Sequence, residues 1–468
     1  MASAQFGIIG LGVMGQNLAL NIEEQGFRVA VWNLEPDWTD RFMEANGGKG
    51  FVAARTFGEL TAAVERPRRI LMMISAGKPV DQTIDSLLPF LDEGDVLIDG
   101  GNSWFRDTQE RSRRLEAKGI HFVGAGISGG EDGARHGASL MPGGTNTAWR
   151  LIAPVFEAIA ARTDAGACVT HVGPDGSGHF VKMVHNGIEY GSMQLIAEAY
   201  DVLRRGARLE ALQLADLFDQ WNRGPLESFL VEITARILRV RDPETGDPLV
   251  EKVVDKAGQK GTGKWTAQVA LDLGIPVPTI SSAIDSRFLS SLKSERVQAA
   301  EILSSPDGSP AEPSLSADVH DALLASTVCC FAQGFALMRN GSTEWNWNIE
   351  LREIARIWMG GCIIRARVLE AIRGAFQTDH DLPNLLVAPE LRDILSRSEA
   401  GWRRAVTYAQ RNGLAVPAMA ASLAYYDGYR TAALPQNLTQ AQRDLFGAHT
   451  YQRNDKGADP PFVHSDWL

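Results

Sequence analysis

The sequence predicts an α/β domain with a doubly wound parallel sheet, followed by a large all-α domain and a C-terminal tail. Short apolar runs alternate with helical periods in the N-terminal part of the 468 residues, as in a parallel sheet covered on both faces. After a glycine-rich turn at residues 173–178, long helical periods continue to about Ala433 with almost no strand signal. The remainder is polar and contains Pro460-Pro461. We expect domains at residues 1–176 and 177–434 and a tail at residues 435–468.

The composition indicates a globular protein that does not bind nucleic acid. Hydrophobic residues make up 44% of the chain, and 46 basic residues stand against 57 acidic ones, for a net charge of −11. A chain without a basic block is a poor partner for nucleic acid. The chain enters a strand within a few residues of its start, and no apolar run reaches the ~18 residues of a membrane span. We therefore expect no signal peptide and no membrane segment.

The cysteines and histidines suggest neither disulfides nor a metal site. The four cysteines are Cys168, Cys329, Cys330 and Cys362, and none forms a CxxC pair. This usage is typical of reduced, buried thiols in a cytoplasmic protein. No grouping of His, Cys, Asp and Glu has convincing ligand spacing, so we predict no metal.

The first predicted strand, Gln5–Ile9, leads into a dinucleotide-binding fingerprint. The fingerprint consists of Gly10, Leu11, Gly12, Val13, Met14 and Gly15. Its glycines permit a tight turn, a close approach of the pyrophosphate and close packing of helix on strand. The helix that begins at Gln16 directs its N-terminus toward the phosphates. This context distinguishes the motif from a glycine turn without a ligand, and it predicts a nicotinamide dinucleotide.

The second predicted strand, Arg28–Trp32, is followed by Asn33, Leu34 and Glu35, where such folds discriminate between NAD and NADP. An acidic side chain binds the ribose 2′-hydroxyl of NAD, whereas an Arg binds the 2′-phosphate of NADP. Glu35 would repel a phosphate if it faces the ribose. Alternatively, Glu35 only begins the next helix, where an acidic residue is favourable. The residues alone leave both interpretations open.

Further apolar runs predict strands at residues 69–74, 95–99, 121–123 and 167–172. Gly100-Gly101-Asn102-Ser103 follows one of them, and Ser128-Gly129-Gly130 follows another. The second turn offers a hydroxyl and two accessible backbone N–H groups, which suit a carboxylate or phosphate. Ligands of doubly wound sheets bind at the carboxyl ends of the strands, so we expect both turns to contribute to one site.

The segment Lys182–Tyr190 is the most informative part of the predicted helical domain. Lys182, His185, Asn186 and Glu189 are spaced i, i+3, i+4 and i+7, so they share one face of a helix. An amine, an imidazole, an amide and a carboxylate form a poor core. They are well suited to hold a polar substrate between a base and an acid.

A second glycine-rich segment, residues 258–265, nearly matches a phosphate-binding P-loop. Trp265 stands where Ser or Thr must bind magnesium, and no strand leads into the segment, so we reject nucleotide hydrolysis. The loop could still bring Lys260 to a substrate phosphate. Arg287 and Arg443 are further candidates for binding an anion, although an isolated Arg usually forms a surface salt bridge.

Five motifs, in order over essentially the whole chain, resemble the decarboxylating 6-phosphogluconate dehydrogenase family. They are Gly10–Asn17, Ile127–Gly133, Lys182–Tyr190, Gly261–Trp265 and Arg443–Thr450. The wider β-hydroxyacid dehydrogenase superfamily shares only the first domain and the lysine. The resemblance implies a Rossmann-like coenzyme domain, a helical domain for substrate binding and dimerisation, and a tail that docks on the partner subunit. It also implies a cytoplasmic homodimer of the pentose phosphate pathway and gluconate utilization.

The resemblance also assigns roles to residues of this chain. It makes Lys182 the general base and Glu189 the general acid in a metal-independent oxidative decarboxylation of 6-phospho-D-gluconate to ribulose 5-phosphate and CO₂. The implied substrate-binding residues are Asn102, Ser128, Gly129, Gly130, His185, Asn186, Tyr190, Lys260, Thr262, Arg287 and, from the partner's tail, Arg443 and His449. The cofactor-binding residues are Gly10, Leu11, Gly12, Val13, Met14, Gly15, Asn33, Leu34, Glu35, Ser75, Ala76 and Asn102.

Three positions depart from the family pattern on the cofactor side. NADP-dependent members usually carry Arg and Ser or Thr where this chain has Leu34 and Glu35, and a common lysine is replaced by Ser75. The family implies NADP, and these losses of positive charge predict that NAD is used or even preferred.

Two other functions compete with this interpretation. A dehydrogenase for an unphosphorylated β-hydroxy acid would not need the cations Lys260, Arg287, Arg443 and His449. A catalytically inactive nucleotide-binding protein would not need both Lys182 and Glu189.

Overall fold

The computed structural model describes residues 3–259, 261–306 and 308–467, and it confirms the predicted fold class. The chain forms two compact units, Met1–Ser422 and Leu423–Leu468. The first unit contains a largely parallel sheet followed by a large helical region, and the second contains the tail. The predicted boundaries at residues 176/177 and 434/435 stay predictions.

The sheet has seven strands in the order β3-β2-β1-β4-β5-β6-β7. The strands are β1 (Phe6–Ile9), β2 (Val29–Trp32), β3 (Phe51–Ala53), β4 (Arg69–Met72), β5 (Val96–Asp99), β6 (His121–Ser128) and β7 (Ser139–Pro142). Neighbouring strands are parallel except for β6 and β7. The strand order reverses between β1 and β4, and a doubly wound sheet binds its ligand at the carboxyl ends beside such a reversal.

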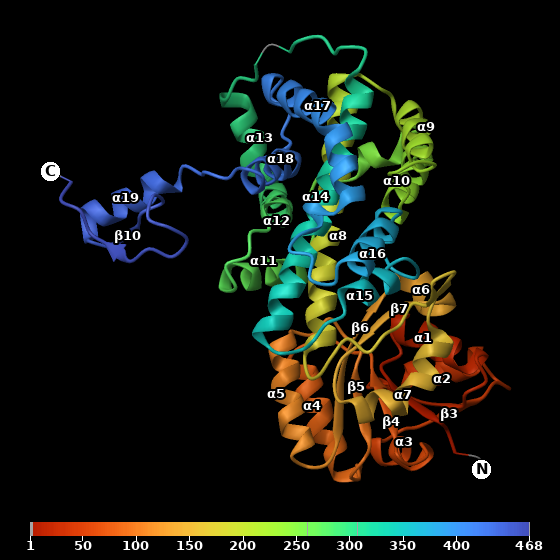
Figure 1. Cartoon of the computed structure of the whole chain (residues 1–468). Coiled ribbons are helices and arrows are strands. Elements are labelled where there is room, and N and C mark those ends of the chain that lie inside the picture. The colour runs from red at the N-terminus through yellow and green to blue at the C-terminus, as the bar shows by residue number, and fades with distance from the viewer. Residues whose placement is uncertain (1–2, 260, 307, 468) are drawn as a thin grey trace. The chain divides into compact units, whose positions relative to one another are not determined.

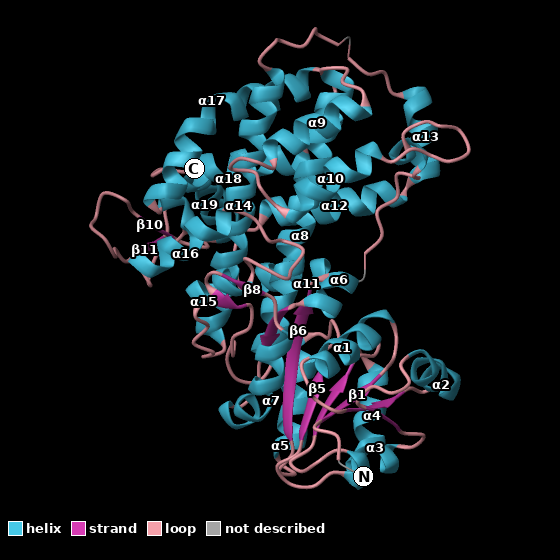
Figure 2. Cartoon of the chain, turned by 90° about the vertical axis from the view of Figure 1, so that its right-hand side faces the viewer, coloured by secondary structure: helices cyan, strands magenta, loops and turns pink. Residues whose placement is uncertain are grey.

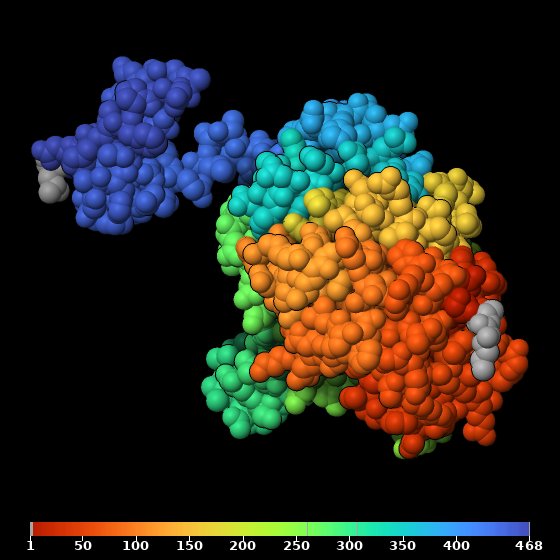
Figure 3. Space-filling model, turned by 90° about the horizontal axis from the view of Figure 1, so that it is seen from below, coloured from red at the N-terminus to blue at the C-terminus, as the bar shows by residue number. Residues whose placement is uncertain are grey.

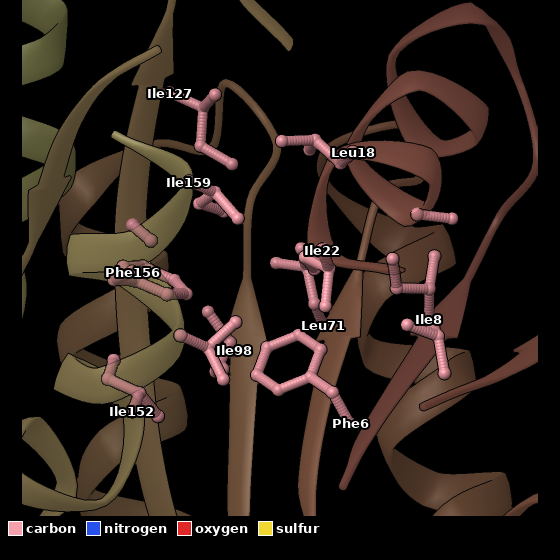
Figure 4. Close-up of a cluster of buried hydrophobic side chains, with 14 of the residues drawn as sticks. Phe6, Ile8, Leu18, Ile22, Leu71, Ile98, Ile127, Ile152, Phe156 and Ile159 are labelled. Atoms are coloured by element: carbon pink, nitrogen blue, oxygen red, sulfur yellow. The ribbon is translucent and has the colours of Figure 1, made fainter. Parts of the chain in front are cut away.

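Helices cover both faces of the sheet, which explains why its strands are continuous apolar runs (Figure 2). These helices are α1 (Val13–Glu24), α2 (Pro36–Ala45), α3 (Phe57–Ala63), α4 (Lys78–Leu87), α5 (Phe105–Glu116), α6 (Gly130–His136) and α7 (Asn146–Ile159), with a 3₁₀ turn η1 (Leu88–Phe90). On one face, Ile8 of β1 belongs to a buried cluster with Ile22 of α1 and Phe156 of α7 (Figure 4). On the other face, Ile70 of β4 belongs to a second buried cluster with Ile84 of α4.

The strand predicted at residues 167–172 is not part of the sheet. Only Gly166–Ala167 forms a strand there, as β9, and it pairs with β8 (Arg162–Thr163) in a separate two-stranded hairpin. Val169 is joined to Leu140 of β7 by an isolated parallel bridge. The place beside β6 is taken by β7, whose Leu140 donates its N–H to Cys168 O over 2.9 Å. The short strands β3 and β7 give too little apolar signal to be recognised as runs.

The helical region is built on two long helices, α8 (Ser177–Asp201) and α14 (Leu315–Glu344), which pack against each other (Figure 1). The others are α9 (Ala211–Trp221), α10 (Phe229–Arg239), α11 (Thr262–Asp272), α12 (Pro278–Ser291), α13 (Lys293–Ile302), α15 (Leu351–Ile357), α16 (Val368–Thr378), α17 (Pro389–Arg411) and α18 (Pro417–Tyr429), with the turns η2 (Val202–Gly206), η3 (Leu249–Lys252) and η4 (Leu385–Val387). Helix α8 also packs against β6 and β7. Seen from below, the first unit presents mainly the surface of its N-terminal part, in red and orange (Figure 3).

Among the described residues, one helix, α14, is long and apolar enough to cross a membrane by length and composition. Most of its apolar window is buried inside the protein, as in a core helix.

The tail folds around one helix and one short hairpin. Helix α19 spans Gln436–Gly447, and β10 (Tyr451–Gln452) pairs antiparallel with β11 (Phe462–Val463). Its described residues from 423 onward bury only Asp444 and Pro460, so hydrophobic packing alone does not hold it together.

Candidate active site

The predicted dinucleotide fingerprint forms the turn between β1 and α1. Gly10 has φ +97°, and a Cβ at Gly10 or Gly15 would collide with a backbone carbonyl. Around Gly12, by contrast, no described atom lies within 4 Å of the position of an added Cβ. Gly12 is also the residue before the first turn of α1, whose N–H groups point outward. The turn is therefore open where a phosphate approaches a helix N-terminus.

A cavity of about 1080 Å³ lies over this turn at the carboxyl ends of the strands. Predicted cofactor residues that line it are Gly12, Val13, Met14, Gly15, Asn33, Leu34, Glu35, Ser75, Ala76 and Asn102, whereas Gly10 and Leu11 are buried and do not line it. Lining residues that sequence reasoning missed include Phe57, Pro79, Gln82 and Thr83. They come from α3 and α4, and no motif marks them in the sequence. None of the described lining residues is Lys, Arg or His.

Asn33, which lines this cavity, connects the glycine turn to Glu35. The amide oxygen of Asn33 accepts the N–H of Leu11 over 2.8 Å, and its Nδ2 donates to Glu35 Oε2 over 2.8 Å. Glu35 occupies the N-cap position of α2, but its side chain makes no cap hydrogen bond in the described structure. Its carboxylate is instead held at the cavity wall beside Leu34, which is 74% exposed.

Asn102 lies in the turn after β5, and the buried carboxylate of Asp99 organises this turn. Asp99 accepts the N–H of Gly101 over 3.0 Å and the hydroxyl of Ser103 over 2.6 Å. His179 Nε2 contacts the Asp99 carbonyl over 3.1 Å. Sequence reasoning missed Asp99, because it reads as the last residue of an apolar strand.

Helix α8 carries the predicted polar stripe into the interior, next to the end of β6. Gly126 of β6 makes this approach possible, since a Cβ there would overlap the side chain of Lys182. Lys182, His185 and Asn186 are buried, and Glu189 is partly buried. The helix therefore brings all four side chains to one face, and Lys182 abuts Gly126, the neighbour of the cavity-wall residue Ile127.

The stripe is connected by polar contacts centred on His185. Its Nδ1 lies 3.5 Å from Lys182 Nζ, 3.1 Å from Asn186 Oδ1 and 3.8 Å from Glu189 Oε2. On the other side of the ring, Nε2 lies 3.1 Å from Ser128 Oγ. The imidazole thus joins the stripe to the Ser128 turn.

Burial shifts the proton affinities of the stripe in the directions that acid–base chemistry needs. Burial lowers the pKa of Lys182, although Glu189 and Cys362 oppose the shift. Burial raises the pKa of Glu189, against the effects of Lys182 and Arg287. Burial and the Lys182 charge hold the pKa of His185 well below its ordinary value. Both shifts favour a neutral amine and a protonated carboxyl, and His185 is a neutral binding group.

The Ser128 turn is shaped by its glycines. Gly129 and Gly130 have φ +135° and +62°, in the region that disfavours other residues. A Cβ on Gly129 would collide with the carbonyl of Gly361, whereas the space beside Gly130 is open. Gly361 also accepts the N–H of Ser139 over 2.8 Å. Sequence reasoning missed the support from Gly361, which is remote in the chain.

Tyr190, Thr262 and Arg287, which are predicted to bind the substrate phosphate, lie near the end of the polar stripe that carries Glu189. Asn186 Nδ2 donates to Thr262 Oγ1 over 2.9 Å. The Arg287 guanidinium stacks over the ring of Tyr190 at 3.7 Å, and its Nη1 donates to Gly258 O over 2.6 Å. Lys260 lies outside the described residues.

Arg443 and His449 belong to the second compact unit, which is described by itself. Arg443 Nη1 donates to Gln440 Oε1 over 2.9 Å, and the His449 ring contacts Phe446 with centroids 5.8 Å apart. The described residues contain no group of three or more His, Cys, Asp or Glu placed to hold a metal ion.

Comparison with known proteins covers almost the whole chain. Residues 5–173 match the family model for the NAD binding domain of 6-phosphogluconate dehydrogenase, and residues 178–467 match the model for its C-terminal domain. A decarboxylating 6-phosphogluconate dehydrogenase from Synechococcus elongatus is 53% identical over the full length of both chains. An NADP(+)-dependent, decarboxylating relative from Bacillus subtilis is 49% identical, again over both full lengths.

A solved structure also matches almost the whole chain. The 6-phosphogluconate dehydrogenase of Plasmodium falciparum, described in its apo form and in complexes with its cofactor NADP⁺ and its substrate 6-phosphogluconate, superposes with a TM-score of 0.95. It is 39% identical, and the match covers 99% of this chain and 100% of that one.

Proposed function

The chain belongs to the 6-phosphogluconate dehydrogenase family, and we propose that it oxidatively decarboxylates 6-phosphogluconate to ribulose 5-phosphate and CO₂ with reduction of NADP or NAD. The observation that carries this proposal is the buried face of α8. There, Lys182 and Glu189 flank His185 beside a dinucleotide-sized cavity.

The cavity suits the dinucleotide because its glycine turn is open at Gly12. A nicotinamide bound there would supply the acceptor for a hydride from C3 of the substrate. In the proposed mechanism, neutral Lys182 takes the proton of the C3 hydroxyl as that hydride leaves, which gives a β-keto acid. The lowered pKa of Lys182 supports this role.

Decarboxylation then uses the proton that Lys182 has gained. As the C1 carboxylate leaves as CO₂, the electron pair of the broken bond flows to the C3 carbonyl oxygen, and protonated Lys182 stabilises the resulting enolate. Glu189, whose pKa is raised by burial, donates its proton to the former C2 carbon to release the ketose phosphate. His185 remains neutral and holds the substrate, together with Asn102, Ser128, Gly129, Gly130 and Asn186.

The phosphate of the substrate would bind at the cations beyond Glu189. We assign it to Tyr190, Thr262 and Arg287, with Lys260 and, from the tail of the second subunit, Arg443 and His449. The stacking of Arg287 on Tyr190 supports this assignment, because it fixes the direction of the guanidinium. An acidic chain can bind an anion in this way, since cations from distant segments converge locally.

We propose NADP as the family's coenzyme, with a preference weakened toward NAD. Glu35 and Leu34 line the adenosine end of the cavity, and Ser75 replaces a lysine. The absence of a basic side chain among the described lining residues supports the weakened preference. The arrangement of Asn33 and Glu35 supports it further, because the carboxylate is held at the wall.

We also propose a cytoplasmic homodimer of the pentose phosphate pathway. Its domains would be residues 1–176 and 177–434, and its tail, residues 435–468, would dock on the partner. Large exposed apolar side chains in the helical region, such as Leu271 (82%) and Ile302 (80%), support an assembly that covers them.

The deciding experiment is the steady-state reduction of each coenzyme with 6-phosphogluconate, with CO₂ release monitored. Stoichiometric reduction and release are expected, and both should be lost in Lys182→Met. Equal turnover of unphosphorylated gluconate would instead favour a different β-hydroxy acid. Coenzyme binding without turnover of any acid would indicate an inactive nucleotide-binding protein.

A further inference from the structure

The second compact unit is organised around one buried carboxylate, Asp444 of α19. Its relative exposure is 0%, although nearly all other described residues of this unit are at least partly exposed. Several large apolar side chains of the unit face solvent, including Leu438, Phe446 and Phe462. A segment of this kind needs polar contacts to hold a defined conformation, because it buries too little apolar surface.

Asp444 accepts four hydrogen bonds from two separate parts of the tail, Thr450 and the segment 464–467. The N–H of Thr450 and Nδ1 of His464 reach Oδ1 over 2.8 and 2.9 Å. The N–H of Ser465 and Nε1 of Trp467 reach Oδ2 over 3.1 and 2.8 Å. Burial alone would raise the pKa of Asp444, but these donors hold it well below its ordinary value, so the carboxylate is ionised.

The contact with Thr450 fixes the turn that follows Arg443. Ala448 and Thr450 have φ +50° and +56°, a conformation that residues other than glycine adopt only under constraint. The constraint comes from two sides. Asp444 binds the N–H of Thr450, and Gln440 Nε2 donates to its carbonyl over 2.6 Å. Gln440 also accepts from Arg443 Nη1.

Arg443 precedes Asp444 directly, and His449 lies inside the constrained turn. The two proposed phosphate ligands therefore flank the residue that determines the conformation of the turn. We propose that Asp444 is a positioning residue for substrate binding: with its donors His464 and Trp467, it sets Arg443 and His449 in the geometry that the substrate phosphate needs. This inference rests on the proposed function of Arg443 and His449.

The test compares Asp444→Asn with the parent enzyme. The amide keeps the size of the side chain but replaces one acceptor oxygen by a donor, so two of the four contacts are lost. A ligand displaced by about 1 Å can cost on the order of 10²-fold. We expect the KM for 6-phosphogluconate to rise at least about tenfold, with the KM for coenzyme and kcat little changed.

Matched variants distinguish a positioning role of Asp444 from a general loss of the tail's structure. Asp455→Asn removes an exposed carboxylate of the same tail that pairs with Arg453 and Lys456 and makes no contact with Arg443 or His449 among the described residues, so it should leave the KM unchanged. Trp467→Phe removes one donor while keeping a ring, and it should raise the KM less than Asp444→Asn. Any turnover of unphosphorylated gluconate should be unaffected in each case, because that acid lacks the phosphate.

The outcomes also distinguish this inference from the function on which it depends. In a double-mutant cycle, Asp444→Asn should add little to Arg443→Ala if it acts through that residue. A large effect of Arg443→Ala with none from Asp444→Asn overturns this inference alone. No effect of Arg443→Ala overturns the phosphate assignment and this inference with it. A parallel loss with gluconate would show that the carboxylate maintains the tail in general, and it would also overturn the inference.

Discussion

The charge of Glu35 should account for a measurable part of the coenzyme selectivity. Its carboxylate accepts from Asn33 Nδ2 over 2.8 Å, and Asn33 is in turn fixed by Leu11 at the glycine turn. The carboxylate is therefore held where the ribose of a dinucleotide is expected in this fold. Glu35→Gln keeps the size of the side chain and its acceptor oxygen but removes the charge.

The size of the effect follows from Coulomb's law. At a separation of about 5 Å, two unit charges repel by about 0.8 kcal/mol in a medium like water and by about 3 kcal/mol at an effective dielectric constant of 20. Glu35 is exposed, so a value near the lower end, about 1 kcal/mol for each phosphate charge, is appropriate. We expect Glu35→Gln to raise the NADP-to-NAD ratio of kcat/KM by about 5- to 30-fold.

The assay is the initial rate of reduction of each coenzyme at saturating 6-phosphogluconate. Asp37→Asn is the matched control, because Asp37 carries the same charge in the first turn of α2 but does not line the cavity. The increase in the NADP-to-NAD ratio of kcat/KM should be larger at low salt, because salt screens the repulsion between Glu35 and the 2′-phosphate. Equal effects of the two substitutions, or a strong preference of the parent enzyme for NADP, would refute the reasoning.

Three further predictions concern buried ionisable groups of α8. Lys182→Met should lower kcat by about 10²- to 10⁴-fold without preventing coenzyme binding, as rates and fluorescence titration can show. Glu189→Gln should lower kcat and abolish the alkaline limb of the pH–rate profile, because activity requires neutral Lys182, above its lowered pKa, and protonated Glu189, below its raised pKa. Burial raises the pKa of Glu198 to about 7 from 4.5. Its folded pKa exceeds the unfolded one, so its contribution to the free energy of unfolding is fully present below about pH 4.5 and falls by about 3 kcal/mol as the pH rises through 7. The free energy of unfolding, measured with urea at pH 5 and pH 8, should differ less between the two pH values in Glu198→Gln than in the parent enzyme.

The fold was predictable wherever one local signal was sufficient. Continuous apolar runs identified β1, β2, β4, β5 and β6, because strands buried on both faces need no polar alternation. The same criterion wrongly extended a strand over residues 167–172 and missed β7. Whether a short apolar segment joins a sheet depends on which neighbour occupies the adjacent edge, and that is decided by tertiary contacts.

Some residues of the candidate site could be predicted from a local signal, and others could not. The spacing of Lys182, His185 and Glu189 placed them on one face, because helix geometry alone sets that arrangement. Asp99 and Gly361 could not be found in this way. Gly361 binds Ser139, which is remote in the chain, so only the folded structure brings the two together. Asp99 binds Ser103 within one turn, but it reads as the end of an apolar strand and belongs to no motif.

A single physical cause accounts for the paired acid and base. Burial disfavours charge, so it lowers the proton affinity of the amine and raises that of the carboxyl. Their mutual attraction works against this, and each is indeed an opposing influence on the other's pKa. His185 lies between them, with its Nδ1 3.5 Å from the amine and 3.8 Å from the carboxylate, and its own pKa is lowered far enough to keep it neutral. An intervening charged imidazole would favour the ionised carboxylate and repel the ammonium. A neutral one leaves both shifts in place, so the amine is more readily neutral and the carboxyl more readily protonated than either would be in water.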